Sequence, residues 1–374
     1  MALAVAVAAA ILVLYTVWQF RNLRLWATPD ATRQLPHAQP SLSVIVPFRN
    51  EAGRLPALLK SLYAQDYAGQ WEIILVDDHS DDDGGTALHV PAGIRLRLLR
   101  LAEHPDYLHG PAYKKAAIAL GVDRSEGEII VTTDADCQWP PEGLSTLAGR
   151  FADGADVVLG TVLIEPVTDL CSAFQALDLA GYQLLTRASV RADEPTLANG
   201  AHFAFTKQAF LEVGGYAGVD HLPSGDDVLL LHKFMRDGGY LIRHAGGPGE
   251  VVLTQPVSGW RSLWKQRLRW AGKAGNYASP ALTFAQALAF ATSLTVVGGL
   301  LLGFIRPAFA GIALAVWTGK AGVDYLLLDR FCRYYGRTGW MRYYWPVQAV
   351  YPFFLVAVGV AALAGARTDW KGRR

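Results

Sequence analysis

The placement of charge along the chain is the feature that most constrains its fold. Residues 1–20 carry no charged side chain, residues 21–273 carry most of the charge, and long uncharged runs return at 281–303 and 343–366. Each uncharged run has about the ~20 residues that a helix needs to cross a bilayer. Hydrophobic residues make up 52% of the chain and charged residues only 18%, which is typical of a membrane protein. We therefore expect a soluble middle domain flanked by transmembrane helices.

The first uncharged run is expected to be an uncleaved anchor. No basic residue precedes it, and Arg21 and Arg24 follow it. A signal peptide has the opposite order of charge, a shorter apolar core and a small-residue cleavage site. Because basic residues favour the cytosolic side of a membrane, the N-terminus of this anchor is predicted to lie outside. Residues 21–40 are then a linker to a cytosolic domain.

A third C-terminal segment, residues 307–328, contains Lys320 and Asp324 one helical turn apart. An ion pair between them would lower the cost of burying both in a membrane, but the segment could also lie at the interface. The region 281–366 is therefore predicted to contain two to three spans, followed by a basic tail at 367–374. Basic residues on both sides of the last run leave its direction open: Arg330, Arg333, Arg337, Arg342, Arg367, Lys371, Arg373 and Arg374.

Net charge and cysteine content exclude several classes of protein. The net charge of +1 gives no basic surface for nucleic acid, so no nucleic-acid partner is expected. Cys137, Cys171 and Cys332 are odd in number and far apart. They therefore offer neither a disulfide framework nor a cysteine-based zinc site, which favours a reducing compartment.

The middle block alternates strand-like and helix-like patterns, which indicates an α/β domain with a mainly parallel sheet. This domain is predicted to cover residues 41–250, followed by an amphipathic or interfacial segment at 251–280. The expected strands are 42–47, 72–77, 95–101 and 128–134, and the expected helices are 55–65, 113–121 and 228–235.

Polar residues follow three of the predicted strands. Ligands of open α/β sheets bind beyond the carboxyl ends of the strands, so these residues are candidates for a binding site. One acidic strand end alone could be an ordinary helix cap, but three together favour a site. The candidates are Pro47, Asn50, Glu51, Asp77, Asp78, Asp134 and Asp136.

Asp134 and Asp136 form an Asp-x-Asp sequence after a buried strand. Their carboxylates are hard oxygen ligands of the kind that hold Mg²⁺ or Mn²⁺. A cation bridged to a diphosphate needs few protein ligands, because phosphate oxygens and water complete its shell. Asp-x-Asp also occurs in plain turns, so its position at a strand end is what favours a metal site.

Two further motifs lie downstream. Asp226 and Asp227 follow Gly225 at the start of an amphipathic helix, where they could cap the helix or supply a general base. The run QRLRW at 266–270 directly precedes the second membrane block and could be an interfacial anchor.

The order of these motifs resembles the membrane-bound family 2 glycosyltransferases with a GT-A fold, including cellulose synthase and hyaluronan synthase relatives. The matching segments, in chain order, are SVIVPFRNEAGRL, EIILVDDHSDD, YKKAAIALG, TTDADCQ, ANGAHFAFTKQAFLEVGGY, SGDDVLLLHKF and QRLRW. The implied fold is a Rossmann-like α/β GT-A domain flanked by transmembrane helices.

The resemblance also implies an inverting sugar transfer from a nucleotide-sugar, by preference a UDP-sugar. Asp227 would be the base with Asp226 beside it, and Asp136 with Asp134 would hold Mg²⁺ or Mn²⁺ on the diphosphate. Gln266, Arg269 and Trp270 would border the acceptor and the diphosphate. The implied donor contacts are Pro47, Asn50, Glu51, Asp77, Asp78, Asp134 and either Lys114 or Lys115.

The acceptor is the least constrained part of this interpretation. Polymer-extruding relatives have more spans, so we expect transfer to a membrane lipid or a lipid-linked hydroxyl. The end motif at 369–373 is similar to relatives that glycosylate lipids, whereas QRLRW favours a processive polysaccharide synthase. An inactive scaffold is a third alternative, although the acidic residues are retained. The expected location is a bacterial inner membrane with the catalytic domain in the cytosol.

Overall fold

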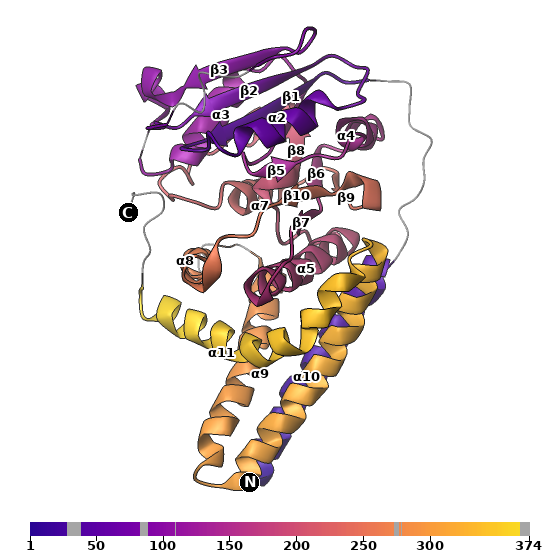
Figure 1. Ribbon diagram of the computed structural model, residues 1–374, viewed down its shortest axis with the longest axis vertical. Coiled ribbons are helices and arrows are strands. Elements are labelled where there is room, and N and C mark those ends of the chain that lie inside the picture. The colour runs from indigo at the N-terminus through magenta and orange to yellow at the C-terminus, as the bar shows by residue number, and fades with distance from the viewer. Residues whose placement is uncertain (28–38, 83–88, 109, 273–276, 278, 367–374) are drawn as a thin grey trace. The chain divides into compact units, whose positions relative to one another are not determined.

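The computed structural model describes residues 1–27, 39–82, 89–108, 110–272, 277 and 279–366. The chain forms two compact units (Figure 1). We call Pro29–Leu163 with Pro195–Gln255 the sheet unit, and Met1–Thr28, Ile164–Glu194 and Pro256–Arg374 the helical unit. Most of the predicted linker, together with the basic tail and the 369–373 motif, lies outside the described residues.

The sheet unit contains a seven-stranded sheet in the order β3-β2-β1-β4-β8-β6-β9. Strands β3, β2, β1 and β4 are parallel, as predicted, and β9 is parallel to β6. Strand β8 runs antiparallel to both of its neighbours, so the sheet is mixed. The strands are β1 Leu42–Phe48, β2 Trp71–Asp77, β3 Leu96–Arg100, β4 Ile129–Thr132, β6 Val157–Gly160, β8 Phe203–Thr206 and β9 Ile242–Ala245.

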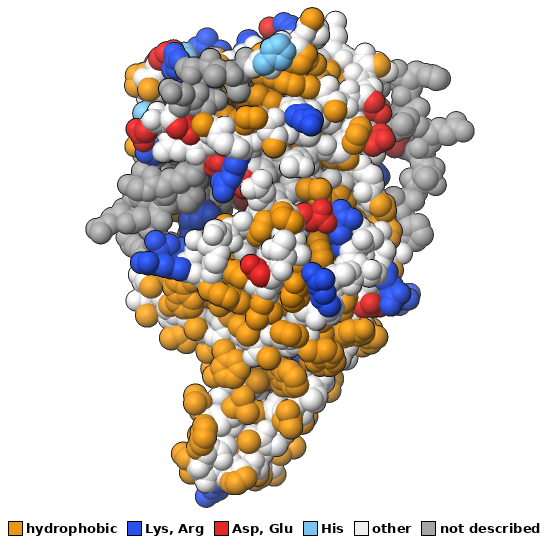
Figure 2. Space-filling view, in the orientation of Figure 1, with side chains coloured by type: hydrophobic (Ala, Val, Ile, Leu, Met, Phe, Trp, Pro, Cys, Tyr) orange, Lys and Arg blue, Asp and Glu red, His pale blue; other side chains and the backbone are white. Residues whose placement is uncertain are grey.

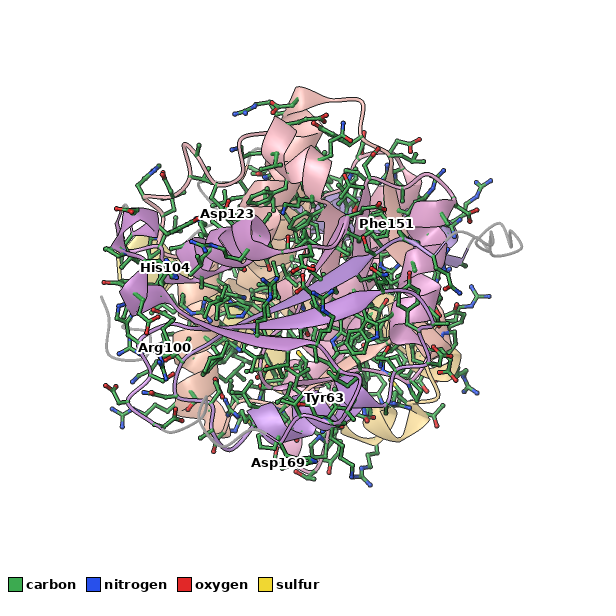
Figure 3. All side chains as sticks on the ribbon, turned by 90° about the horizontal axis from the view of Figure 1, so that it is seen from above. Tyr63, Arg100, His104, Asp123, Phe151 and Asp169 are labelled. Carbon is green, nitrogen blue, oxygen red and sulfur yellow. The ribbon has the colours of Figure 1, made fainter. Side chains whose placement is uncertain are left out.

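Strand β1 is buried along its whole length, because it has strands on both edges and helices on its faces. Helix α3 (Tyr113–Arg124) packs on β1 and β2. This packing is close at Gly121, where a Cβ would lie 2.6 Å from Cγ2 of Ile45. Arg100 on the edge strand β3 and Phe151 on α4 (Gly143–Ala152), a helix that packs on β6 and β9, lie on opposite sides of the view in Figure 3.

The remaining elements of the sheet unit are short. A second sheet has the order β5-β10-β7. Its strands are β5 Cys137–Gln138, β10 Val252–Thr254 and β7 Val162–Ile164; the other helices are α2 Leu55–Tyr63, α6 Lys207–Glu212 and α7 Asp226–Asp237, with 3₁₀ turns η1 Leu101–Glu103, η2 Pro105–Tyr107, η3 Gly200–His202 and η4 Pro248–Glu250.

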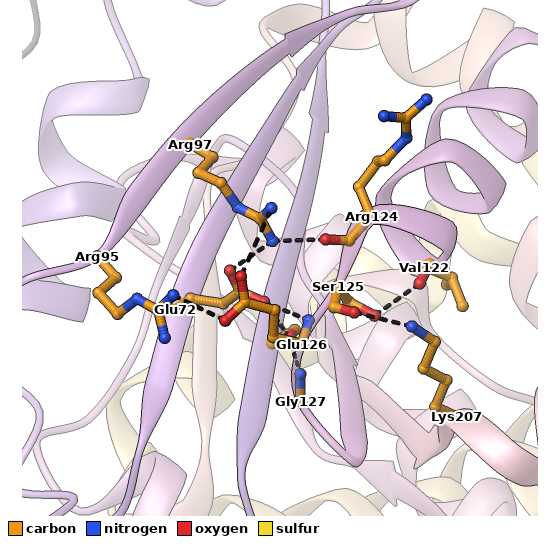
Figure 4. A network of polar contacts seen from close by, with 10 residues as sticks. Glu72, Arg95, Arg97, Val122, Arg124, Ser125, Glu126, Gly127 and Lys207 are labelled. Atoms are coloured by element: carbon orange, nitrogen blue, oxygen red, sulfur yellow. Dashed lines mark hydrogen bonds and ion pairs between the residues drawn. The ribbon is translucent and has the colours of Figure 1, made fainter.

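A polar network, the amino-end clamp, joins the amino ends of the parallel strands (Figure 4). It consists of Ser43 on β1, Glu72 on β2, Arg97 on β3 and Glu126 before β4. The Glu72 carboxylate accepts hydrogen bonds from Ser43 Oγ, the Glu126 backbone N–H and Arg97 Nη2, each at 2.7 Å. Burial alone would raise the pKa of Glu72, but these donors and the Arg97 charge outweigh it and lower the pKa.

The helical unit is built on long apolar helices. Four described segments are long and apolar enough to cross a membrane: Ala2–Ala27, Pro280–Gly303, Pro307–Tyr334 and Thr338–Leu363. Hydrophobic side chains cover most of the lower part of the molecule in Figure 2, where Figure 1 places α1, α9 and α10. The protein is a membrane protein with one N-terminal and three C-terminal candidate spans. The helices are α1 Ala2–Ala27, α5 Leu170–Arg191, α8 Gly259–Ala271, α9 Pro280–Gly303, α10 Pro307–Tyr334 and α11 Tyr344–Leu363, with η6 Thr338–Tyr343.

Two boundaries differ from the sequence-based expectation. Helix α1 runs past the predicted anchor (residues 1–20) to Ala27, and the Arg21 guanidinium stacks back on Trp18, 5.2 Å from its ring centroid. Helix α5 falls within the predicted range 41–250 but groups with the helical unit. It is buried on almost every side and packs on α1, α10 and α11.

Candidate active site

The loops after β1 and β2 are tied together at the carboxyl edge of the sheet. The backbone N–H of Asn50 donates to Ser80 Oγ at 2.9 Å, and the N–H of Asp81 donates to Asn50 Oδ1 at 2.7 Å. Asp77 Oδ1 accepts the N–H of Ser80 at 2.9 Å. The structure therefore brings the predicted residues Asn50 and Asp77 into one interlocked pair of loops.

Three other predicted donor contacts lie at or near these loops. Asp78 is buried, and its Oδ1 lies 3.0 Å from His79 Nδ1. Glu51 pairs with Arg54 at 3.1 Å. Pro47, the last residue of the predicted strand, lies within β1 and pairs with Val76. It is buried, as is the rest of the strand.

The acidic cluster consists of Asp134, Asp226 and Asp227 around the ammonium of Lys114. Lys114 Nζ lies 2.8 Å from Asp134 Oδ1 and 3.1 Å from Asp226 Oδ2. Gly225 has φ 82°, a left-handed conformation that suits glycine, and this turn starts α7 with both acids in its first turn. Strand β4, helix α3 and helix α7 thus bring together residues that are up to 113 positions apart in the sequence.

Gly200 is a site residue that sequence reasoning missed. Its N–H donates to Asp227 Oδ2 at 3.0 Å, and the N–H of Val228 donates to Asp227 Oδ1 at 2.8 Å. A Cβ on Gly200 would lie 3.1 Å from Lys114 Nζ and 3.2 Å from Asp226 Oδ2. The segment ANGAHF was noted for its resemblance, but nothing local in the sequence indicates this contact.

The structure distinguishes the two lysines that the sequence left open. Burial would lower the pKa of Lys114, but attraction to Asp134, Asp226 and Asp227 raises it well above its usual value. Lys115 points elsewhere and donates to the carbonyls of Val219 and Leu222, each at 2.7 Å. Burial lowers the pKa of Lys115 to about 8. Lys114 is therefore the lysine that lies at the acidic cluster, and Lys115 holds the loop that contains Val219 and Leu222.

Asp136 is a part-buried carboxylate at the same edge of the sheet, and its pKa is raised. Burial raises its pKa to about 6, and the neighbouring charge of Asp134 adds to the effect. Within the described part of the chain, no group of three or more His, Cys, Asp or Glu side chains is arranged to hold a metal ion. The two carboxylates Asp134 and Asp136 fit a cation whose other ligands come from a diphosphate and water.

The QRLRW motif lies on α8 of the helical unit, where Arg267 organises it. Arg267 Nε donates to Asp178 Oδ2 at 2.8 Å, and both side chains are buried. Its Nη1 donates to Gln266 Oε1 at 2.8 Å, and its guanidinium lies 4.2 Å from the Trp270 ring centroid. Arg267 therefore holds Gln266 and Trp270 in place. The roles of Gln266, Arg269 and Trp270 remain predictions. The partner of Arg267, Asp178, lies 89 positions away, and nothing in the QRLRW motif predicts this contact.

Comparison with known families identifies the class of protein. Residues 43–170 match the glycosyl transferase family 2 model, and residues 129–357 match the glycosyl transferase family group 2 model. The second match alone covers more than half of the chain. The protein belongs to the family 2 glycosyltransferases.

Individual relatives are more distant. The undecaprenyl-phosphate 4-deoxy-4-formamido-L-arabinose transferase of Pseudomonas paraeruginosa is 36% identical over 122 residues, covering 31% of this chain and 34% of the relative. The Aeromonas hydrophila subsp. hydrophila transferase of that name is 32% identical over 120 residues, covering 31% and 35%. The matches thus span about a third of the curated relatives' length.

The fold is that of GT-A glycosyltransferases. A solved structure of a mannosyltransferase from Pyrobaculum calidifontis, in complex with GDP-Man and Mn²⁺, aligns with a TM-score of 0.60 and 23% sequence identity. The alignment covers 98% of this chain and 99% of that one. The expected fold class is therefore confirmed.

Proposed function

We propose that this protein is an inverting glycosyltransferase that transfers a sugar from a nucleotide-sugar, by preference a UDP-sugar, to the hydroxyl of a membrane lipid. The observation that carries this proposal is the acidic cluster at the carboxyl edge of the sheet, with Asp227 held by two backbone N–H groups. Family membership and the names of the transferase relatives support the reaction class. Four apolar helices support an acceptor that lies in the membrane.

Asp227 acts as the general base in this proposal. Its carboxylate takes the proton of the acceptor hydroxyl while the acceptor oxygen bonds to the anomeric carbon of the sugar. The bond from that carbon to the diphosphate oxygen breaks on the opposite side, so the configuration inverts and the nucleoside diphosphate leaves. The N–H groups of Gly200 and Val228 orient the carboxylate for this task.

Lys114 and the Asp134–Asp136 pair serve the leaving group. The Lys114 ammonium keeps its charge because three carboxylates surround it, and it would attract the negative charge that develops on the diphosphate. A divalent cation such as Mn²⁺ or Mg²⁺, held by Asp134 and Asp136, would neutralise further charge on the leaving group. Asn50, Asp77 and the buried Asp78 would position the nucleoside in the interlocked loops.

The test is to reconstitute the full chain in lipid nanodiscs with bacterial lipids and a panel of nucleotide-sugars. Lipids are then extracted for mass spectrometry. A glycolipid that forms in the presence of Mn²⁺ or Mg²⁺, and not after chelation with EDTA, supports the proposal. Polymer without glycolipid would identify a processive synthase instead, and the absence of any sugar transfer from every donor would contradict the proposed function.

We further propose that the sheet unit faces the cytosol of a bacterial inner membrane, since Arg21 and Arg24 lie near the carboxyl end of the first candidate span, Ala2–Ala27. The test introduces Ala68→Cys at an exposed position of the sheet unit. The native cysteines are free and buried, which keeps background labelling low. An impermeant thiol reagent should label this cysteine in inside-out vesicles and not in sealed right-side-out vesicles, and the opposite result would reverse the orientation.

A further inference from the structure

The helical unit contains a cavity of about 100 Å³ that the proposed chemistry does not use. Helices α1, α5, α9, α10 and α11 all contribute to its wall, with polar groups from four of them. The polar lining includes Asn22, Asp178, Lys320, Asp324 and Gln348. Ionisable groups inside membrane helices are costly and usually mark a functional site.

The charges that line the cavity are neutralised in pairs. Lys320 Nζ lies 2.5 Å from Asp324 Oδ2, and Tyr15 donates to the other oxygen of Asp324 at 2.5 Å. Asp178 is paired with Arg267 at 2.8 Å. An anionic ligand such as a phosphate would have to displace one of these carboxylates from its cation. The described lining therefore favours an uncharged ligand.

One hydrogen-bond acceptor in the wall still needs a donor. Asn22 is only 2% exposed, and its Oδ1 has no hydrogen-bond partner among the described residues. Leaving such a buried polar atom unpaired costs about 1–3 kcal/mol. A ligand hydroxyl could donate to this oxygen, whereas an ester or a hydrocarbon chain could not.

We propose that this cavity binds the uncharged, hydroxyl-bearing head group of a membrane lipid. Asn22 accepts the hydroxyl proton, and the Lys320, Asp324 and Gln348 network supplies the polar wall around it. That this lipid is also the sugar acceptor rests on the proposed function. Lipid binding in the cavity requires no turnover, so it can be tested separately from the acceptor role.

Gly181 offers a way to fill the cavity without disturbing the fold. It lies in the cavity wall on α5, and a Cβ placed on it meets no atom within 4 Å among its described surroundings. Gly181→Leu therefore adds volume without a clash at Cβ and replaces a poor helix former by a good one. Gly311→Leu on α10 is the matched control, because Gly311 is also exposed on a helix with open space and is not part of the wall.

The experiment uses the full chain in phosphatidylcholine nanodiscs with a photoactivatable diacylglycerol, in the absence of any nucleotide-sugar. Crosslinking should map to α1, α5 or α10 and should be competed by dioleoylglycerol but not by trioleoylglycerol, which lacks the hydroxyl. Gly181→Leu should reduce crosslinking at least about tenfold, and Asn22→Leu about fivefold for the loss of one hydrogen bond. Gly311→Leu should match the wild type, and thermal melting checks that each variant is folded.

Equal competition by trioleoylglycerol, stronger competition by a polyprenyl phosphate, or wild-type crosslinking in folded Gly181→Leu would overturn the proposal. Whether the bound lipid is also the sugar acceptor is decided by comparing crosslinking with sugar transfer. If specific crosslinking is seen but no nucleotide-sugar glycosylates diacylglycerol, the binding site stands and its assignment to the acceptor fails. If transfer occurs to a lipid that does not compete for crosslinking, the enzyme stands and the cavity is not the acceptor site.

Discussion

The two ends of the parallel strands in the sheet unit carry polar networks of opposite character. In the amino-end clamp, the single buried carboxylate of Glu72 receives three hydrogen bonds, and its pKa is lowered. In the acidic cluster, three carboxylates surround one ammonium. Close to it, the pKa of Asp136 is raised to about 6.

Under the proposed function, this difference separates a network that stabilises the fold from one that binds a ligand. At the amino end, every charge has its partner within the protein, so a ligand would gain nothing there. At the carboxyl end, negative charge exceeds positive charge in a part-buried site, and a cation or a proton would relieve the excess. Substitutions in the first network should therefore change stability, and substitutions in the second should change activity.

The largest expected effect is on turnover at the carboxyl end. Asp227→Asn keeps the size of the side chain, and its single amide oxygen can accept the N–H of either Gly200 or Val228, but it cannot take a proton from the acceptor. We expect kcat to fall by about 10²–10⁴-fold, the range for general acid–base catalysis, with nucleotide affinity and melting temperature close to wild type. Initial rates measure kcat, and titration with the nucleoside diphosphate measures nucleotide affinity. Near-normal turnover would mean that the base lies elsewhere.

The matching change at the amino end should act on stability alone. Glu72→Ala removes the acceptor of three hydrogen bonds and leaves Arg97 without its buried carboxylate, which should cost about 3 kcal/mol. Arg95→Ala is the control, since it removes a 2.7 Å pair with Glu126 in which both side chains are exposed, worth less than about 1 kcal/mol. Melting curves measure the difference. A loss of kcat in Glu72→Ala below its melting range would contradict the separation of roles.

The sequence singled out acidic residues of one of these networks as candidates and none of the other, for a physical reason. Acidic residues at the ends of β2 and β4 directly follow apolar runs, so local pattern places them at the edge of the sheet. Asp226 and Asp227 were singled out by their place at the start of a helix and by the family resemblance. The clamp depends on the register that sets Ser43 beside Glu72 and on the loop before β4. Strand register between distant segments has no local signal.

The direction in which a side chain points was a second feature that the sequence could not predict. Lys114 and Lys115 are adjacent, yet on a helix neighbours point about 100° apart, and the packing of α3 decides which one reaches the acidic cluster. The partners of Arg267 and of helix α5 could not be predicted either, because they are distant in the sequence. Their partners, Asp178 and the helices of the helical unit, become neighbours only in the folded chain.

A third prediction concerns pH and a buried group beside Gly200. His202 is buried, and burial lowers its pKa to about 4 from 6.5. Between these pH values the unfolded chain binds a proton that the folded chain does not, so stability should fall by up to about 3 kcal/mol as the pH drops from 6.5 to 4. His202→Asn removes the titration and keeps a donor near the Thr161 carbonyl, which lies 3.3 Å from Nδ1. Melting curves across this range should be flatter for the variant, and equal slopes would contradict the assignment.

The smallest expected effect separates the two acids of the cluster. Asp226 Oδ2 lies 3.1 Å from Lys114 Nζ, so Asp226→Asn removes one of the charges around the ammonium while Asp134 remains at 2.8 Å. The amide oxygen can still accept a hydrogen bond from Lys114, and the loss of one part-buried charge pair should cost about 1 kcal/mol, or about fivefold in kcat/KM. Steady-state rates for Asp226→Asn and Asp227→Asn under the same conditions make the comparison. An inactive Asp226→Asn beside an active Asp227→Asn would transfer the role of base to Asp226, the residue that here serves to hold Lys114 in place.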